Sequence, residues 1–167
     1  MGLDMYLSAR KYINKIDWNL VDQNYDSDNR YENATRHEYK SVIEAANMAD
    51  IAKNNDIYGV QVGVNVAYWR KVNAVHNWFV ENVQKGEDDC GEYYVSHDKL
   101  KELLETARQA LFHKDPSKLK PQAGFFFGST DIDEWYWEGV KDTIKQIKRL
   151  IELPDFEDLS FYYQSSW

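Results

Sequence analysis

The sequence has little of the residues that mark secreted, membrane or zinc-binding proteins. It contains one cysteine, Cys90, which excludes an intrachain disulfide and a four-cysteine zinc site. No apolar run approaches the roughly 18 residues that a membrane-spanning helix needs. The first residues also lack the basic and apolar regions of a secretion signal. We therefore expect a protein of a reducing cytoplasm with no membrane partner.

Basic residues are scarce beside acidic ones. The chain has 20 Lys and Arg against 28 Asp and Glu, a net charge of −8. Nucleic-acid binding needs a basic surface, so this balance disfavours nucleic acid as a partner. The acidity suits solubility or a basic partner protein. An acidic decoy that mimics DNA stays open as one hypothesis.

Glycine-rich and catalytic motifs are missing as well. The sequence has no Walker A loop, no dinucleotide-binding glycine pattern, no nucleophile elbow and no HExxH. This absence favours a binding function over an enzyme, and we predict no cofactor, no metal and no catalytic residue.

Aromatic residues are plentiful, with six Trp and twelve Tyr in 167 residues, so the chain can build a core. Hydrophobic periodicity predicts an α+β fold in a single domain: a small mixed or antiparallel sheet packed with about four helices. Residues 14–56 look like an inserted loop and helix, and the aromatic tail is expected to dock on the rest. The predicted elements are a strand at 2–9, an irregular loop at 14–31, a helix at 32–55, a strand at 56–68, a helix at 69–84, an extended segment at 91–96, helices at 97–112 and 131–153, and a buried strand at 123–129.

Two helix starts are predicted from capping residues. Ser96 precedes the helix at 97–112, and Thr130 precedes the last helix, whose first-turn acids complement the helix dipole. The predicted buried side of the last helix consists of Ile132, Tyr136, Val140, Thr143, Ile147 and Leu150.

His76 lies at the centre of an apolar stripe on the helix at 69–84. A structural interpretation makes it a buried histidine, hydrogen-bonded to the backbone or to a strand residue such as Asp4. A functional interpretation makes it the general base of a small enzyme, oriented by Asp4 or Asp88. No nucleophile or metal-ligand spacing accompanies it, which favours the structural interpretation.

Trp78 points about 160° away from that stripe on a helical wheel. Two alternatives follow: the loop at 14–31 or the C-terminal tail covers it, or it contacts a partner, since Trp dominates interface hot spots. Arg70 and Lys71 near the start of the same helix can hold an anion or form a solvated face.

The stretches "GEDDCGEYYVS" and "FFFGSTDIDEWYWEG" complete the candidate surface. The acidic turn lacks the ligand spacing of a Ca²⁺ loop and is predicted to be solvated. Trp135 and Trp137 flank Tyr136 and are predicted to reach the surface, where they either stack on a base or partner, or cover the end of the sheet. The full set of candidate ligand- or partner-binding residues is Arg70, Lys71, His76, Trp78, Tyr93, Tyr94, Trp135 and Trp137.

Three stretches, "MGLDMYL", "YWRKVNAVHNWFVENVQKGEDDCGEYYVS" and "GFFFGSTDIDEWYW", together resemble a group of short accessory proteins of tailed bacteriophages. The resemblance covers roughly residues 1–10 and 58–152. It implies a phage accessory protein in the host bacterial cytoplasm, of a class that often acts on host machinery or defence by binding. Together with the aromatic-rich surface and the missing catalytic motifs, this leads to the hypothesis that the protein captures a host protein or a nucleotide-like signalling ligand. The resemblance brings no catalytic residues, and it leaves the ligand and a homo-oligomer open.

Overall fold

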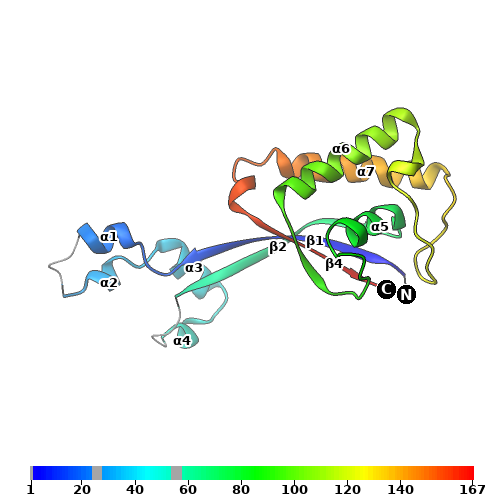
Figure 1. Cartoon of the computed structure of the whole chain (residues 1–167). Coiled ribbons are helices and arrows are strands. Elements are labelled where there is room, and N and C mark those ends of the chain that lie inside the picture. Colours follow the sequence, from blue (N-terminus) through cyan, green and yellow to red (C-terminus); the bar gives the residue numbers. More distant parts are fainter. Residues whose placement is uncertain (1, 24–27, 54–57) are drawn as a thin grey trace. The chain divides into compact units, whose positions relative to one another are not determined.

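A computed structural model describes residues 2–23, 28–53 and 58–167 of the chain (Figure 1). It is an α+β structure with a four-stranded antiparallel sheet, as predicted. The chain divides into two compact units, Met1–Ala9 with Gly63–Trp167, and Arg10–Val62, and each is described separately below. The elements are β1 (Asp4–Asn14), α1 (Trp18–Gln23), α2 (Arg30–Asn33), α3 (His37–Ala45), α4 (Ala49–Ala52), β2 (Gly59–Arg70), α5 (Asn73–Asn82), β3 (Glu92–Val95), α6 (His97–His113), the 3-10 helix η1 (Pro116–Lys118), α7 (Glu134–Ile151), the 3-10 helix η2 (Phe156–Asp158) and β4 (Ser160–Ser166).

The strands lie in the order β2-β1-β4-β3. The predicted opening strand is confirmed: Leu3, Met5 and Leu7 are fully buried and alternate with partly exposed residues, because successive side chains of a strand point to opposite faces. The aromatic tail docks as β4, an inner strand. It pairs with β3 so that Val95 faces Phe161.

The strand predicted at 56–68 is confirmed in its described part, but it ends later than expected. Trp69, predicted to begin the following helix, is the penultimate residue of β2 and is almost completely buried. Ala67 and Trp69 therefore face the core, while Tyr68 and Arg70 face outward. Lys71, with a left-handed φ of 56°, then redirects the chain into α5.

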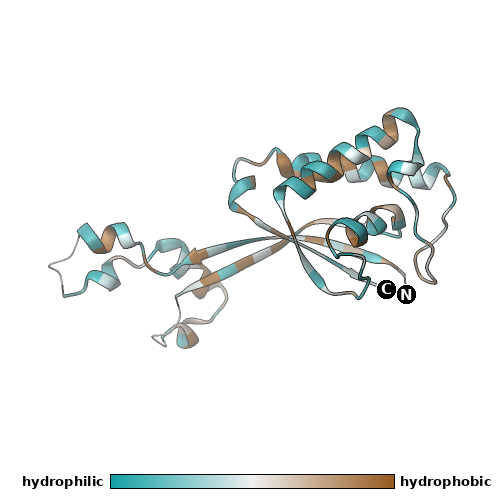
Figure 2. Cartoon of the chain, viewed as in Figure 1, coloured by the Kyte–Doolittle hydropathy of each residue, from teal (hydrophilic) through white to brown (hydrophobic). Residues whose placement is uncertain are grey.

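Helices α6 and α7 lie side by side over one face of the sheet (Figure 1). Hydrophobic and hydrophilic residues alternate along both of them (Figure 2). Ser96 caps α6 as predicted, because its side chain accepts a hydrogen bond from the Lys99 N–H. In the parts of the chain that the structure describes, no helix has both the length and the apolar character needed to cross a bilayer.

The buried face of α7 agrees with the predicted spacing, since Val140, Thr143, Ile147 and Leu150 are all buried. The predicted start was wrong. Asp133, rather than Thr130, is the N-cap: its carboxylate accepts a hydrogen bond from the Tyr136 N–H at 3.0 Å. Ile132 consequently precedes the helix and is exposed, not buried.

The predicted buried strand at 123–129 is a turn instead. Its three phenylalanines do not share one environment: Phe127 is buried, whereas Phe125 is 94% exposed. Gly128 has a φ of 89°, a left-handed conformation that ends extended backbone and that glycine adopts without a steric penalty.

In the unit formed by residues 10–62, the buried hydrophobic residues are Val21, Ala34, Tyr39 and Ile43. The loop predicted at 14–31 was wrong in part, because its described residues include α1 and the start of α2. The helix predicted at 32–55 is divided: Asn47 adopts a φ of 53°, which interrupts helical geometry between α3 and α4. The last residues of this predicted helix, 54 and 55, and the first two of the predicted strand, 56 and 57, lie outside the described residues.

Candidate functional site

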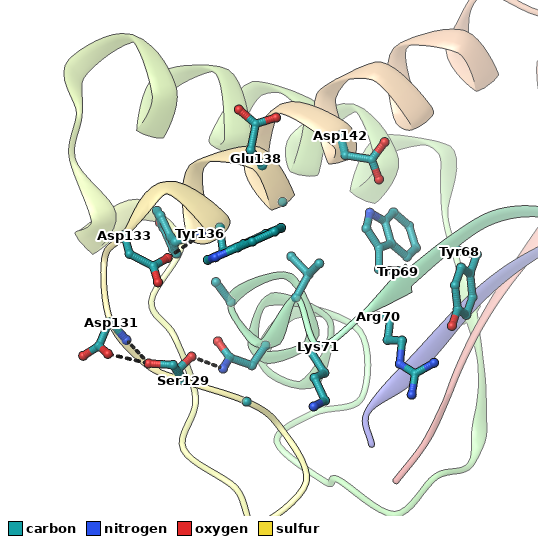
Figure 3. A pocket seen from close by; sticks show the side chains of 16 residues that line it. Tyr68, Trp69, Arg70, Lys71, Ser129, Asp131, Asp133, Tyr136, Glu138 and Asp142 are labelled. Carbon is teal, nitrogen blue, oxygen red and sulfur yellow. Dashed lines mark hydrogen bonds between the residues drawn. The ribbon is translucent and has the colours of Figure 1, made fainter. Parts of the chain in front are cut away.

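A pocket of about 740 Å³ lies between the end of β2, the start of α5, the 128–133 segment and α7 (Figure 3). Its size falls in the range of about 300–1,000 Å³ that is typical of small-molecule sites. All of its lining residues belong to the unit formed by residues 1–9 and 63–167.

Arg70 and Lys71 line the side of the pocket that lies away from α7 (Figure 3). The left-handed turn at Lys71 is held by a 2.8 Å hydrogen bond from its N–H to the Leu3 carbonyl. The Arg70 Nε lies 4.0 Å from an Asp4 carboxylate oxygen, yet most of the side chain is exposed. Two cationic groups are thus available to a ligand.

Trp135 lines the same pocket and is 84% exposed. The helical period explains why: Tyr136 and Val140 face the hydrophobic core, so Trp135, the residue before Tyr136, points away from it. The exposure of this indole agrees with the prediction from the sequence. A flat aromatic surface therefore lines the same pocket as the two cations.

Four carboxylates line the pocket, and each already has a partner. Asp133 caps α7, and Asp131 accepts a hydrogen bond from the Ser129 hydroxyl at 2.7 Å. Glu138 pairs through one oxygen with Lys141, and Asp142 accepts through Oδ2 from Gln146. The described residues contain no group of three His, Cys, Asp or Glu side chains placed to hold a metal ion.

Trp69 contributes a buried donor to the pocket. The residue is only 1% exposed, it lines the pocket, and its indole N–H has no hydrogen-bond partner among the residues that the structure describes. In Figure 3 the indole nitrogen is turned toward α7, where Glu138 and Asp142 lie. Sequence reasoning missed this residue because it assigned Trp69 to a helix. Continuing the alternating strand pattern by one residue would have found it.

His76 does not line the pocket. It is fully buried, with Nδ1 at 2.8 Å from the Tyr163 hydroxyl and Nε2 at 3.0 Å from Asp88 Oδ2. Asp88 is one of the two partners predicted for it; Asp4 instead bonds to Tyr68 and lies beside Arg70.

The His76 network is satisfied internally. A carboxylate only accepts hydrogen bonds, so Nε2–H donates to Asp88 and leaves Nδ1 to accept from the Tyr163 hydroxyl. Trp167 Nε1 donates to the other Asp88 oxygen at 3.1 Å. Burial, followed by the charge of Asp88, raises the pKa of Tyr163 well above its usual value, so this hydroxyl keeps its proton. The geometry is that of a buried structural histidine.

Trp78 is 5% exposed and is not available to a partner. Residues 117–120 lie beside it, and the Lys99 ammonium lies 6.0 Å from its ring centroid. The sequence predicted that either the loop at 14–31 or the C-terminal tail covers Trp78. Instead, η1 and α6 cover it, because tertiary packing brings these two helices onto the outer side of α5.

The remaining candidates lie away from the pocket. The Tyr93 hydroxyl donates to Asp89 at 3.0 Å, a bond that raises the pKa of Tyr93. Tyr94 is exposed, with its ring edge against Tyr162. Trp137 is partly buried, with the Lys114 ammonium 4.6 Å from its ring. Of the eight predicted residues, the pocket brings together three: Arg70, Lys71 and Trp135.

Glu138 and Asp142 were also missed from the sequence, although a signal for them exists. They lie four residues apart, which places both on one face of a helix, and that face is not the apolar one. The chain matches no protein-family model, no curated protein and no solved structure.

Proposed function

We propose that this chain is a phage accessory protein that acts by binding, and that the pocket captures a nucleotide-like ligand in the host cytoplasm. The ring of the ligand stacks on Trp135, and its anionic group meets Arg70 and Lys71. The observation that carries the proposal is that the 84% exposed Trp135 indole and two cations line one pocket of about 740 Å³.

The side chains at the pocket suit both parts of such a ligand. Stacking of a base on an aromatic side chain is worth about 1–3 kcal/mol. Arg70 offers a planar fork of donors that matches phosphate oxygens, and Lys71 offers a compact positive charge. The carboxylates of α7 lie on the other side of the pocket and repel an anion there. A nucleotide is therefore oriented with its phosphate toward Arg70 and Lys71.

The phage setting is supported by the resemblance described above. Two of the three stretches that carry it, at 68–96 and 124–137, also supply most of the pocket-lining residues. A functional pocket is one reason for those stretches to resemble the sequences of a group of proteins.

A host protein is the second candidate ligand, favoured by the apolar side chains near Trp135. Phe125 is 94% exposed and Ile132 is exposed in the same segment. Exposed large apolar side chains that gather in one segment are a feature of protein-binding surfaces. In this case the partner covers Phe125 and Trp135 together.

Isothermal titration calorimetry with AMP, GMP, CMP and UMP tests the nucleotide proposal. We expect Trp135→Ala to weaken binding by about 1–3 kcal/mol, roughly 5- to 150-fold, through the lost stacking. Phe125→Ala is the matched control for a nucleotide, because it removes an exposed ring that does not line the pocket. The double variant Arg70→Gln/Lys71→Gln should weaken binding as well, whereas Lys145→Gln on the exposed side of α7 should not.

Native mass spectrometry of the protein from phage-infected cells adds the biological ligand. A bound small molecule that the Trp135→Ala variant loses supports the nucleotide proposal. A bound host protein that both Trp135→Ala and Phe125→Ala lose supports the second candidate. Recovery of the protein with neither partner, together with no binding of the four nucleotides, would overturn the proposal.

A further inference from the structure

The unpaired N–H of Trp69 indicates part of what the pocket binds. The side chain is 99% buried, and buried donors in folded proteins are nearly always paired. Trp69 lines the pocket, its N–H is turned toward α7 (Figure 3), and this N–H meets no acceptor within the described residues, so a ligand atom that reaches that side is its natural partner. That ligand atom has to be a hydrogen-bond acceptor.

Two carboxylates beside Trp69 add the opposite requirement. Glu138 and Asp142 lie on α7, on the side toward which the Trp69 nitrogen is turned (Figure 3). Each has one oxygen in a hydrogen bond: Glu138 Oε1 with Lys141, and Asp142 Oδ2 with Gln146. The second oxygen of each carboxylate can accept from a ligand, so the ligand has to bring N–H donors.

Gln146 fixes the position of Asp142 relative to Trp69. Its side-chain oxygen accepts from the Tyr68 N–H at 3.0 Å, and its amide nitrogen donates to the Tyr68 carbonyl at 3.0 Å and to Asp142 at 2.6 Å. One side chain thus ties the acceptor on α7 to the backbone of the residue that precedes Trp69. The donor and the acceptor are held in place before a ligand arrives, which lowers the cost of binding.

Three ligand chemistries fail to match these groups together. A guanidinium satisfies the carboxylates but leaves Trp69 unpaired, because it has no acceptor. A phosphate supplies acceptors but is repelled by Glu138 and Asp142. The edge of adenine offers one amino donor beside its acceptors, which serves only one of the two carboxylates.

The edge of guanine matches all three groups. It carries the O6 acceptor beside the N1–H and the N2 amino donors. We infer that the pocket selects a guanine nucleotide: O6 accepts from Trp69, the N1 and N2 donors meet Asp142 and Glu138, the ring stacks on Trp135, and the phosphate lies at Arg70 and Lys71. This inference rests on the proposed function, since it names the ligand class of the same pocket.

The test is calorimetric titration with four defined ligands: GMP, IMP, AMP and the 2-aminopurine ribonucleotide. IMP lacks only the N2 amino group, whereas 2-aminopurine lacks O6 and, with it, the N1–H, so it keeps only the N2 donor of the matching edge. One neutral hydrogen bond corresponds to roughly 2- to 12-fold in affinity, and one to a charged group to roughly 12- to 150-fold. We expect GMP to bind most tightly, IMP to lose the larger factor, and 2-aminopurine ribonucleotide and AMP to bind more weakly than GMP.

Variants assign each contact. Trp69→Phe keeps the ring but removes the donor, so it should weaken GMP roughly 2- to 12-fold and leave the 2-aminopurine ribonucleotide unchanged. Asp142→Asn should weaken GMP roughly 12- to 150-fold. Glu134→Gln is its matched control, because this exposed carboxylate of α7 does not line the pocket. Circular dichroism checks that each variant is folded; if Trp69→Phe is not, Asp142→Asn and the ligand series carry the test.

The outcomes separate this inference from the proposed function. If AMP binds as tightly as GMP and Trp135→Ala weakens both, the guanine inference is overturned and the nucleotide pocket stands. If free arginine binds more tightly than GMP, the inference is overturned because a guanidinium is then the preferred ligand. If no nucleotide binds, the proposed capture of a nucleotide fails first.

Discussion

His76 and Tyr163 should be energetically coupled, and the structure predicts the sign of that coupling. The Tyr163 hydroxyl lies 2.8 Å from His76 Nδ1, and both residues are completely buried. His76→Ala removes a core ring and leaves the hydroxyl without its partner. Tyr163→Phe removes the hydroxyl and leaves the ring nitrogen without its partner. The double variant removes both members of the bond.

The magnitudes follow from burial. Removing a core side chain of this size costs about 2–5 kcal/mol of the free energy of unfolding. A stranded buried polar atom adds about 1–3 kcal/mol. Tyr163→Phe alone should therefore cost about 1–3 kcal/mol. In the His76→Ala background the same change should cost close to nothing or stabilise the protein, which is a coupling of about 1–3 kcal/mol.

Urea unfolding followed by far-UV circular dichroism measures all four proteins. Tyr136→Phe is the matched control, because its hydroxyl donates to the Leu119 carbonyl and does not contact His76. The stability costs of His76→Ala and Tyr136→Phe should therefore add within about 0.3–0.5 kcal/mol in the double variant. Additivity of the same quality between His76 and Tyr163 would refute the reasoning. The binding of a nucleotide provides a second check: a folded His76 variant that loses it contradicts a purely structural role, because His76 does not line the pocket.

Three further predictions concern the cap of α7, the two tryptophans and alkaline pH. Asp133→Ala should lower the free energy of unfolding by about 0.5–2 kcal/mol in urea titrations, whereas Thr130→Ala should change it little; the reverse order would restore the cap predicted from the sequence. Trp78→Ala should cost about 3–5 kcal/mol in the same assay and Trp135→Ala less than about 0.5, so equal costs would contradict the burial of only one of them. The free energy of unfolding should fall as the pH rises above 10. The pKa of Tyr163 is raised well above its usual value in the folded protein, so the unfolded chain loses this proton first. The free energy of unfolding then falls by up to about 1.4 kcal/mol per pH unit. Burial raises the pKa of Tyr136 to about 12, but Tyr136 adds a smaller part to this loss because it is half-exposed. Urea midpoints between pH 8 and 11 should therefore decline less in Tyr136→Phe than in the unchanged protein. A midpoint that does not change with pH contradicts both assignments.

Much of the fold was readable because its signals are local. The alternation of Leu3, Met5 and Leu7 needs only the two-residue period of a strand, and the buried face of α7 needs only the helical period. Ser96 caps α6 through a bond that spans three residues. These features depend on neighbours in the sequence, so one sequence is enough to find them.

The errors arise where distant segments decide. The segments that cover Trp78 were missed because a helical wheel shows only one covered side, whereas residues 117–120 and Lys99 of α6 lie beside its outer side. Helix α5 is consequently buried on more than one face, as its run of buried residues shows. The three phenylalanines at 125–127 looked like a strand, yet the 3.1 Å bond from the Phe127 N–H to the Gly124 carbonyl and the left-handed Gly128 make that segment a turn.

The residues of the pocket show the same difference between local signals and tertiary packing. Arg70, Lys71 and Trp135 were predicted because charge and an off-stripe aromatic ring are visible in the sequence. Trp69 and Asp142 were not, because their role exists only once the end of β2 lies against α7, where Gln146 joins the two elements. The predicted residues describe what any anionic aromatic ligand would meet, and the unpredicted ones carry its selectivity. If Gln146 sets that selectivity through Asp142, Gln146→Ala should bring GMP and AMP, which lacks the N1–H, closer in affinity while the stacking contribution of Trp135 stays unchanged. Titration of both ligands into Gln146→Ala and into Gln146→Ala/Trp135→Ala measures this, and an unaltered preference for GMP would show that α7 and β2 position the two groups without it.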